Sequence, residues 1–123
     1  MIHEDLTNRI LGAAITVHKA LGPALAEQSY QAAMAIEMHA CGLAFEREPR
    51  LTVKYRGVEI GHHRPDFIVE RLVVLELKSV SGLDPVFTSQ VLTYLRLTEL
   101  KVGLLINFNV PSMANDGIKR LAL

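Results

Sequence analysis

Three polar residues with the potential for chemistry lie in or beside the most apolar part of the sequence. Glu76 and Lys78 stand two residues apart in the segment LVVLELK, residues 72–78. Because side chains alternate along a strand, both point to the same face. Burying a carboxylate and an ammonium group is costly unless they pair or bind a ligand. Asp66 begins the preceding strand, and a hairpin between the two strands would bring it opposite Leu75 or Glu76.

Two carboxylates beside a lysine suit a hard divalent cation. Mg²⁺ binds through one or two carboxylates and keeps open positions for water and for substrate phosphate. Such a metal activates a water and neutralises charge on a phosphate, while a neighbouring lysine can orient that water or stabilise the charge. The alternative is an internal ion pair without a chemical role. The E-x-K spacing alone is weak, and its position inside an apolar strand is what favours a functional site.

The turn between these two strands decides whether the carboxylates meet. A shift of one residue in the pairing moves every side chain to the opposite face. A two-residue turn at residues 70–71 would pair Asp66 with Leu75 and separate the carboxylates. We therefore expect a three-residue connection or a bulge between Val69 and Val73.

The elements around these strands follow from the spacing of apolar residues. The first forty residues predict two helices, one with Asp5 as its cap and one that starts at Pro23 and ends near Ala40. Alternation on both sides of Gly57 predicts a hairpin, and Asp84 is the expected cap of a later helix. The expected strands cover residues 51–56, 58–60, 67–69, 72–80 and 102–108, with 118–123 as a further candidate, and the later helix covers residues 84–98.

This order of elements, ααββββαβ(β), defines the expected fold class. It predicts an α/β (α+β) fold with one mixed central β-sheet flanked by helices. The length of 123 residues is typical of one domain, so residues 1–123 are expected to form a single domain. No apolar run approaches the roughly 20 residues of a membrane span, and the N-terminus lacks the features of a signal peptide.

Charge and cysteine content exclude several classes of protein. Thirteen basic and 13 acidic residues leave no net charge, which argues against a globally basic nucleic-acid-binding domain. Any phosphate binding is therefore expected to be local; residues 44–71 carry six basic and five acidic side chains besides His62 and His63. The histidine pair is not counted as part of a metal site. Cys41 is the single cysteine, which predicts a buried thiol in a reduced, cytoplasmic protein.

Two further pairs of residues share a helix face with each other. Glu27 and Tyr30 are three residues apart on the second expected helix, and Gln90 and Tyr94 are four apart on the later one. Each pair could line a site next to the carboxylates. The alternative reading is a surface glutamate, half-buried tyrosines and a solvated glutamine.

These motifs follow one another in an order that matches a known family. In chain order they are Glu27 and Tyr30, Asp66, Glu76-Leu77-Lys78, Gln90 and Tyr94, residues 103–108, Pro111 and residues 117–120. The arrangement resembles the PD-(D/E)XK nuclease superfamily, and most closely its small bacterial branch, the GxxExxY proteins. The resemblance covers nearly the whole chain. One position departs from the branch, because Ala24 stands where its naming motif has glycine.

The resemblance implies a restriction-endonuclease-like core and a metal-dependent phosphodiesterase. It implies Mg²⁺ or Mn²⁺ as cofactor and nucleic acid as substrate, with DNA favoured over RNA. It assigns Lys78 as the catalytic lysine, with Asp66 and Glu76 acting beside it. The implied metal ligands are Glu27, Asp66 and Glu76, and the implied site-lining residues are Gln90, Tyr30 and Tyr94.

Two other classes of function stay open from the sequence. A catalytically inactive module with the same fold could bind nucleic acid or a protein partner, and the neutral net charge favours this reading. A structural assembly protein is supported only by the hydrophobic content of 50%. The same content in so short a chain leaves room for a homodimer.

Overall fold

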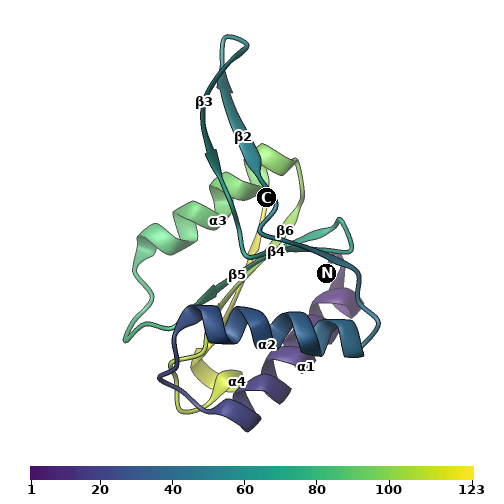
Figure 1. Cartoon of the computed structure of the whole chain (residues 1–123), viewed down its shortest axis with the longest axis vertical. Coiled ribbons are helices and arrows are strands. Elements are labelled where there is room, and N and C mark those ends of the chain that lie inside the picture. The colour runs from purple at the N-terminus through teal and green to yellow at the C-terminus, as the bar shows by residue number, and fades with distance from the viewer.

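The chain folds into two long helices, a run of five strands, a third helix, and two strands separated by a one-turn helix (Figure 1). The computed structural model describes residues 1–123 apart from the side chain of Asn115. The elements are α1 (Glu4–Leu21), α2 (Glu27–Ala40), β1 (Phe45–Arg47), β2 (Leu51–Tyr55), β3 (Val58–His63), β4 (Phe67–Val69), β5 (Val73–Lys78), α3 (Pro85–Thr98), β6 (Val102–Asn107), α4 (Met113–Asp116) and β7 (Ile118–Ala122). Within the described residues, no helix combines the length and hydropathy that a membrane span requires.

Five strands form a mixed central sheet in the order β1-β4-β5-β6-β7. The central pair β5 and β6 is parallel, and all other neighbours are antiparallel. Parallel neighbours need a crossover connection, which α3 supplies between β5 and β6. Both strands of this central pair are almost fully buried, as their continuous apolar sequences predict. The predicted fold class, helices around a mixed sheet, is confirmed.

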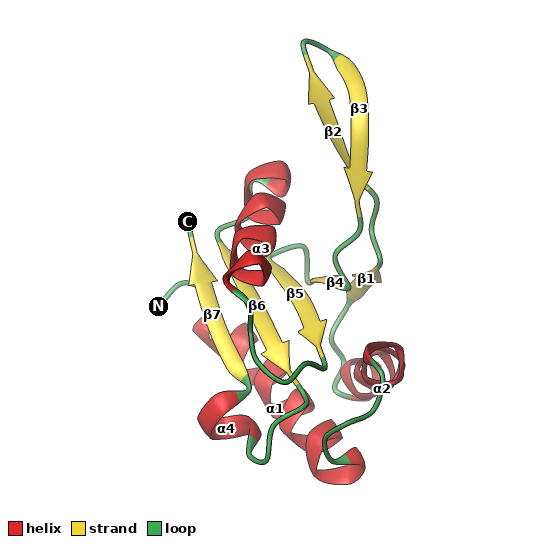
Figure 2. Cartoon of the chain, turned by 90° about the vertical axis from the view of Figure 1, so that its left-hand side faces the viewer, coloured by secondary structure: helices red, strands yellow, loops and turns green.

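Helices cover the two faces of this sheet (Figure 2). On one face, Leu75 and Leu77 of β5 pack in a core that includes residues of α1 and α2. On the other face, Val74 packs with Tyr94 and Leu95 of α3. Because side chains alternate along β5, Glu76 lies on the same face as Val74, toward α3.

The β2–β3 hairpin projects away from the rest of the molecule (Figures 1 and 2). Its turn residues Arg56 and Gly57 have φ angles of 51° and 82°, as expected for a tight two-residue hairpin turn. The predicted hairpin is thus confirmed, but its expected place in the central sheet is wrong. It forms a two-stranded sheet of its own, while β1, which the sequence did not predict, pairs with β4 at the edge. β1 has only three residues, FER, too few for a recognisable alternation.

The starts of the first two helices differ from expectation. α1 begins at Glu4, and Asp5 lies in its first turn instead of capping it. α2 begins at Glu27, because the chain from residue 22 to residue 26 forms a loop in which Ala24 has a φ of 74°. A left-handed residue interrupts the helical path, so Pro23 cannot be the first residue of α2.

The later helix begins as its sequence predicts. Asp84 caps α3, and its carboxylate accepts a hydrogen bond of 2.9 Å from the Val86 amide. Pro85 occupies the first turn, where its missing N–H has no intrahelical partner to lose. The expected buried thiol is wrong: Cys41, just after α2, is exposed.

Candidate active site

The connection between β4 and β5 has the length that places the carboxylates of Asp66 and Glu76 on the same face of the sheet. Val69 pairs with Val73, so three residues, 70–72, connect the two strands. Glu70 and Arg71 have φ angles of 52° and 59°, and the Leu72 amide donates to the Val69 carbonyl at 2.9 Å. The predicted three-residue connection is confirmed.

Asp66 and Glu76 lie opposite each other where β4 begins. Continuing the β4–β5 register by one residue from Phe67↔Leu75 pairs them directly. The Asp66 amide donates to Glu76 Oε1 at 2.9 Å, and the Leu77 amide donates to Asp66 Oδ2 at 2.7 Å. Each carboxylate is therefore held by the backbone beside the other one, which fixes both in position.

Lys78 completes the cluster on the same face of β5. Its Nζ lies 3.8 Å from Glu76 Oε2 and 4.6 Å from the centre of the Phe87 ring on α3. The aromatic face and the carboxylate both attract the ammonium group. The structure thus brings Asp66, Glu76 and Lys78 together.

The electrostatics of this cluster disfavour negative charge. Burial raises the pKa of Glu76 to about 8, and the charge of Asp66 and a hydrogen bond with it act in the same direction. The charge of Lys78 lowers this pKa but does not offset burial. Burial, followed by the charges of Glu76 and Asp66, also raises the pKa of Tyr94 above its ordinary value. A cation bound here would relieve this repulsion.

Gln31 and Arg47 belong to the cluster but were not identified from the sequence. Gln31 Nε2 donates to Asp66 Oδ1 at 2.7 Å, and Arg47 Nε donates to Gln31 Oε1 at 2.9 Å. Gln31 is only 6% exposed, so its amide is committed to these partners. A signal was available: Gln31 follows Glu27 by four residues and therefore shares its face of α2.

Glu27 lies near the cluster without joining it. It occupies the first turn of α2, exposed to solvent. Ser79 Oγ, one residue after Lys78, donates to the Leu25 carbonyl at 2.6 Å and holds the start of α2 beside the end of β5. Among the described side chains, no group of three or more His, Cys, Asp or Glu is arranged to hold a metal.

Asn107 fixes the chain just beyond Lys78. It is 3% exposed and pairs with Lys78 in the parallel β5–β6 register. Its Nδ2 donates to the Val80 carbonyl at 2.9 Å, and its Oδ1 accepts from the amides of Val80 and Asn109, each at 3.1 Å. This side chain therefore joins the ends of β5 and β6 next to the charged cluster.

The three residues expected to line the site have different surroundings. The Tyr30 ring is fully buried in the core on the α1–α2 face, stacked 4.4 Å from Phe108. Its hydroxyl donates to the Gly22 carbonyl at 2.5 Å, so it holds the loop before α2. Gln90 and Tyr94 instead line a cleft on the α3 face.

This cleft adjoins the charged cluster through Lys78. Its volume is about 400 Å³, and it lies between α3, the end of β5 and the foot of the β2–β3 hairpin. Its lining residues are His63, Lys78, Val86, Phe87, Ser89, Gln90, Thr93 and Tyr94. A polar ligand in this cleft would meet the ammonium group of Lys78.

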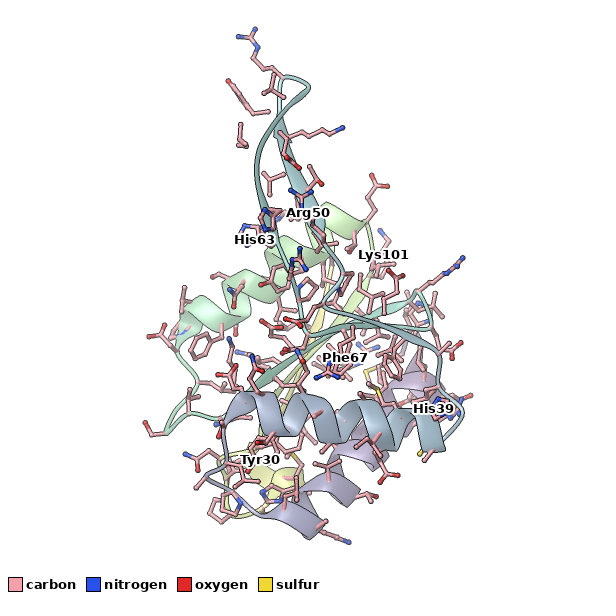
Figure 3. All side chains as sticks on the ribbon, viewed as in Figure 1. Tyr30, His39, Arg50, His63, Phe67 and Lys101 are labelled. Atoms are coloured by element: carbon pink, nitrogen blue, oxygen red, sulfur yellow. The ribbon has the colours of Figure 1, made fainter. Side chains whose placement is uncertain are left out.

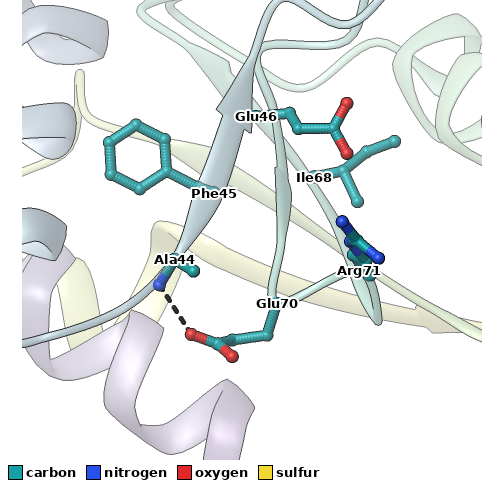
Figure 4. Close-up of a pocket in the computed structure, with 6 residues that line it drawn as sticks. All are labelled: Ala44, Phe45, Glu46, Ile68, Glu70 and Arg71. Atoms are coloured by element: carbon teal, nitrogen blue, oxygen red, sulfur yellow. Dashed lines mark hydrogen bonds between the residues drawn. The ribbon is translucent and has the colours of Figure 1, made fainter.

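A second hollow of about 220 Å³ lies along the edge strand β1 (Figure 4). Its lining residues are Ala44, Phe45, Glu46, Ile68, Glu70 and Arg71, and the Ala44 amide donates to Glu70 Oε2 at 2.6 Å. This contact joins β1 to the turn after β4. None of the three clustered residues lines this hollow.

Comparison with known proteins agrees with this arrangement. Neither a curated protein nor a solved structure matched the chain. A family model described as PD-(D/E)XK nuclease superfamily matches residues 4–121. The match spans nearly every element of the fold, including the strands that carry Asp66, Glu76 and Lys78. The chain therefore belongs to the PD-(D/E)XK nuclease superfamily.

Proposed function

We propose that this protein is a metal-dependent nuclease that hydrolyses a phosphodiester bond of nucleic acid. The observation that carries the proposal is the meeting of Asp66, Glu76 and Lys78 beside a cleft, in a chain of the PD-(D/E)XK nuclease superfamily. Two carboxylates and one ammonium group meet the needs of metal-assisted phosphodiester hydrolysis. An internal ion pair alone would not require two adjacent acids.

The available donor atoms fit Mg²⁺ or Mn²⁺. Asp66 and Glu76 offer carboxylate oxygens, the ligands that these cations prefer. We assign Glu27 as a third ligand, because it shares a face of α2 with Gln31, which already contacts Asp66. Its exposed carboxylate would turn toward the pair on binding. When bound, the metal supplies an activated water and neutralises charge on the phosphate.

The other residues of the site would act on the substrate. Lys78 would place its ammonium group beside the phosphate and stabilise the charge that develops there. Tyr94 lines the same cleft, and its hydroxyl, protonated at neutral pH like that of any tyrosine, can donate to a phosphate oxygen. Gln90 would line the path of the nucleic acid along the same cleft.

Finer assignments follow from the resemblance of the sequence to the superfamily. The spacing of Glu27 and Tyr30 supports placement in the GxxExxY branch. We favour DNA over RNA as substrate, action in the cytoplasm, and one nuclease-like domain over residues 1–123.

Calorimetric titration with Mg²⁺ and Mn²⁺ tests the metal site. The wild type should bind metal, and Glu76→Ala should lose most of that binding because a central ligand is gone. Glu46→Ala removes an exposed carboxylate on β1 and should behave as the wild type. A wild type that binds neither metal would contradict the proposal and support the inactive module.

A cleavage assay on single- and double-stranded substrates completes this test. Lys78→Ala should still bind metal but lose nearly all cleavage, because a charge-stabilising group acts mainly in the transition state. If the cluster is only a structural ion pair, the same variant would be strongly destabilised and the wild type would cleave nothing.

A further inference from the structure

The β2–β3 hairpin is a basic element to which the proposed catalysis assigns no role. Residues 50–64 contain four basic and one acidic residue, a net charge of +3 in a chain whose total charge is zero. The remaining residues therefore carry a net charge of −3. Such a separation of charge favours a polyanion as the partner of the hairpin.

The register of the hairpin gives it one polar face. Thr52 pairs with His62, and Lys54 pairs with Glu59, so these residues point to the same side. Arg50 joins them, with its guanidinium 2.9 Å from Glu59 and 3.1 Å from Thr52. Within the described residues, Lys54 and the turn residue Arg56 form neither an ion pair nor a side-chain hydrogen bond, and both are exposed. Their charges are therefore free to meet a ligand near the tip.

The foot of the hairpin is anchored beside the catalytic cleft. Leu51 packs against the core on the α3 face. His63 lines the cleft together with Lys78, and its ring centre lies 5.9 Å from that of Tyr94. Figure 3 shows His63 and Arg50 at this foot, close to α3. Only two residues separate His63 from Asp66, so a polymer bound along the hairpin would lead directly to the cluster.

We propose that the β2–β3 hairpin is an arm that binds duplex nucleic acid and holds it across the cleft. This inference rests on the proposed nuclease function and names the form of its substrate. A two-stranded β-ribbon fits the major groove of B-form DNA. The six residues of β3 span roughly 20 Å, enough to follow that groove.

The composition of the arm favours a duplex over two other partners. Single strands are held mainly by stacking on aromatic rings, and Tyr55 is the only Phe, Tyr or Trp in the arm. The exposed side chains of Tyr55, Val58 and Ile60 would also suit a second copy of the chain. Two copies would bring two arms of charge +3 together, and this repulsion disfavours an arm-to-arm dimer.

Fluorescence anisotropy with a short labelled DNA duplex tests the arm, with EDTA present to prevent cleavage. The variant Lys54→Ala/Arg56→Ala should bind the duplex roughly tenfold more weakly than the wild type. The slope of log affinity against log salt should fall by about 2, because two phosphate contacts are lost. The control Lys19→Ala/Lys119→Ala removes the same charge from positions on α1 and β7, away from the arm, and should keep wild-type affinity. The matching single strand should bind the wild type more weakly than the duplex.

Three results would contradict the proposal that the hairpin binds a duplex. They are no duplex binding by the wild type, an equal loss of duplex affinity in both double variants, or tighter binding of the single strand than of the duplex. A dimeric wild type that becomes monomeric in Tyr55→Ser/Val58→Ser, with duplex binding unchanged, would assign the hairpin to a second copy instead. Because the assay contains no metal, it is independent of catalysis. Arm-dependent binding without any metal binding or cleavage would overturn only the nuclease proposal. If Lys54→Ala/Arg56→Ala cleaves a duplex as fast as the wild type, only the proposed role of the arm would be contradicted.

Discussion

Glu76 is the residue whose surroundings say most about the site. Glu76 is 6% exposed and lies opposite Asp66, and both its burial and the charge of Asp66 raise its pKa. The positive charge of Lys78, 3.8 Å away, lowers that pKa. Burial dominates, so the pKa of Glu76 rises to about 8 and the carboxyl holds a proton at neutral pH. A divalent cation would displace that proton, which links the electrostatics of the free protein to the proposed metal site.

The stability of the metal-free protein should therefore fall as the pH rises. The pKa of Glu76 is about 8 in the fold against an ordinary 4.5, so the folded state holds a proton that the unfolded state releases. The stabilisation is fully present below pH 4.5 and is lost as the pH rises to about 8, a difference on the order of 4 kcal/mol. Urea unfolding at pH 5 and pH 8 measures it. Glu76→Gln cannot ionise and should lose most of this dependence; an equally steep profile in that variant would assign the effect to other groups.

Among the elements, the loop before α2 places the helix that faces the site. The Tyr30 hydroxyl accepts from the Leu25 amide at 3.2 Å, and Ser79 holds the Leu25 carbonyl, so the loop is tied to both α2 and the end of β5. Ala24 lies within this loop with a φ of 74°, a region that glycine adopts without strain. The glycine expected at this position from the GxxExxY motif thus has a backbone reason.

Ala24→Gly should therefore stabilise the protein. Relieving a left-handed alanine should raise the free energy of unfolding by roughly 0.5–1 kcal/mol, after allowing for the greater chain entropy of glycine. Ala32→Gly, inside α2, should instead lower it by about 1 kcal/mol. Thermal melts of both variants against the wild type provide the measurement. A loss of stability in both would mean that the strain at Ala24 is absent in solution.

For the whole molecule, the distance between α3 and the sheet determines the shape of the cleft. Gly103 of β6 lies under α3, and a Cβ at this position would meet Val91 Cγ1 at 2.6 Å. Real Cβ contacts are not so short, so a larger residue would require either the Val91 side chain or the helix that carries it to shift. Because α3 carries Phe87, Gln90 and Tyr94, an outward shift of the helix would widen the cleft.

Gly103→Ala should destabilise the fold by roughly 1–3 kcal/mol through overpacking. At Gly12, inside α1, a Cβ would meet no neighbouring atom within 4 Å, so Gly12→Ala should gain roughly 0.5–1 kcal/mol from helix propensity. Chemical denaturation of the two variants tests whether the free energy of unfolding falls in Gly103→Ala and rises in Gly12→Ala. A neutral Gly103→Ala would show that α3 can move away from the sheet without loss.

The sequence by itself determined the parts that depend on neighbours along the chain. Continuous apolar residues identified β5 and β6, Asp84 and Pro85 marked the start of α3, and Gly57 marked the hairpin turn. The length of the β4–β5 connection also followed, because only one register places Asp66 beside Glu76. The spacing of apolar residues and the residue types that favour turns are local features of the chain, so they can be recognised without knowing the fold.

Only the tertiary structure decided which distant segments meet. Gln31 reaches Asp66 across 35 positions of sequence, and Arg47 reaches Gln31 across 16. The hairpin is not part of the central sheet, because β1 pairs with β4 at the sheet edge instead. β1 has three residues with little apolar pattern of their own. Such pairings depend on the packing of whole elements and on buried polar groups finding partners, and neither leaves a local pattern in the chain.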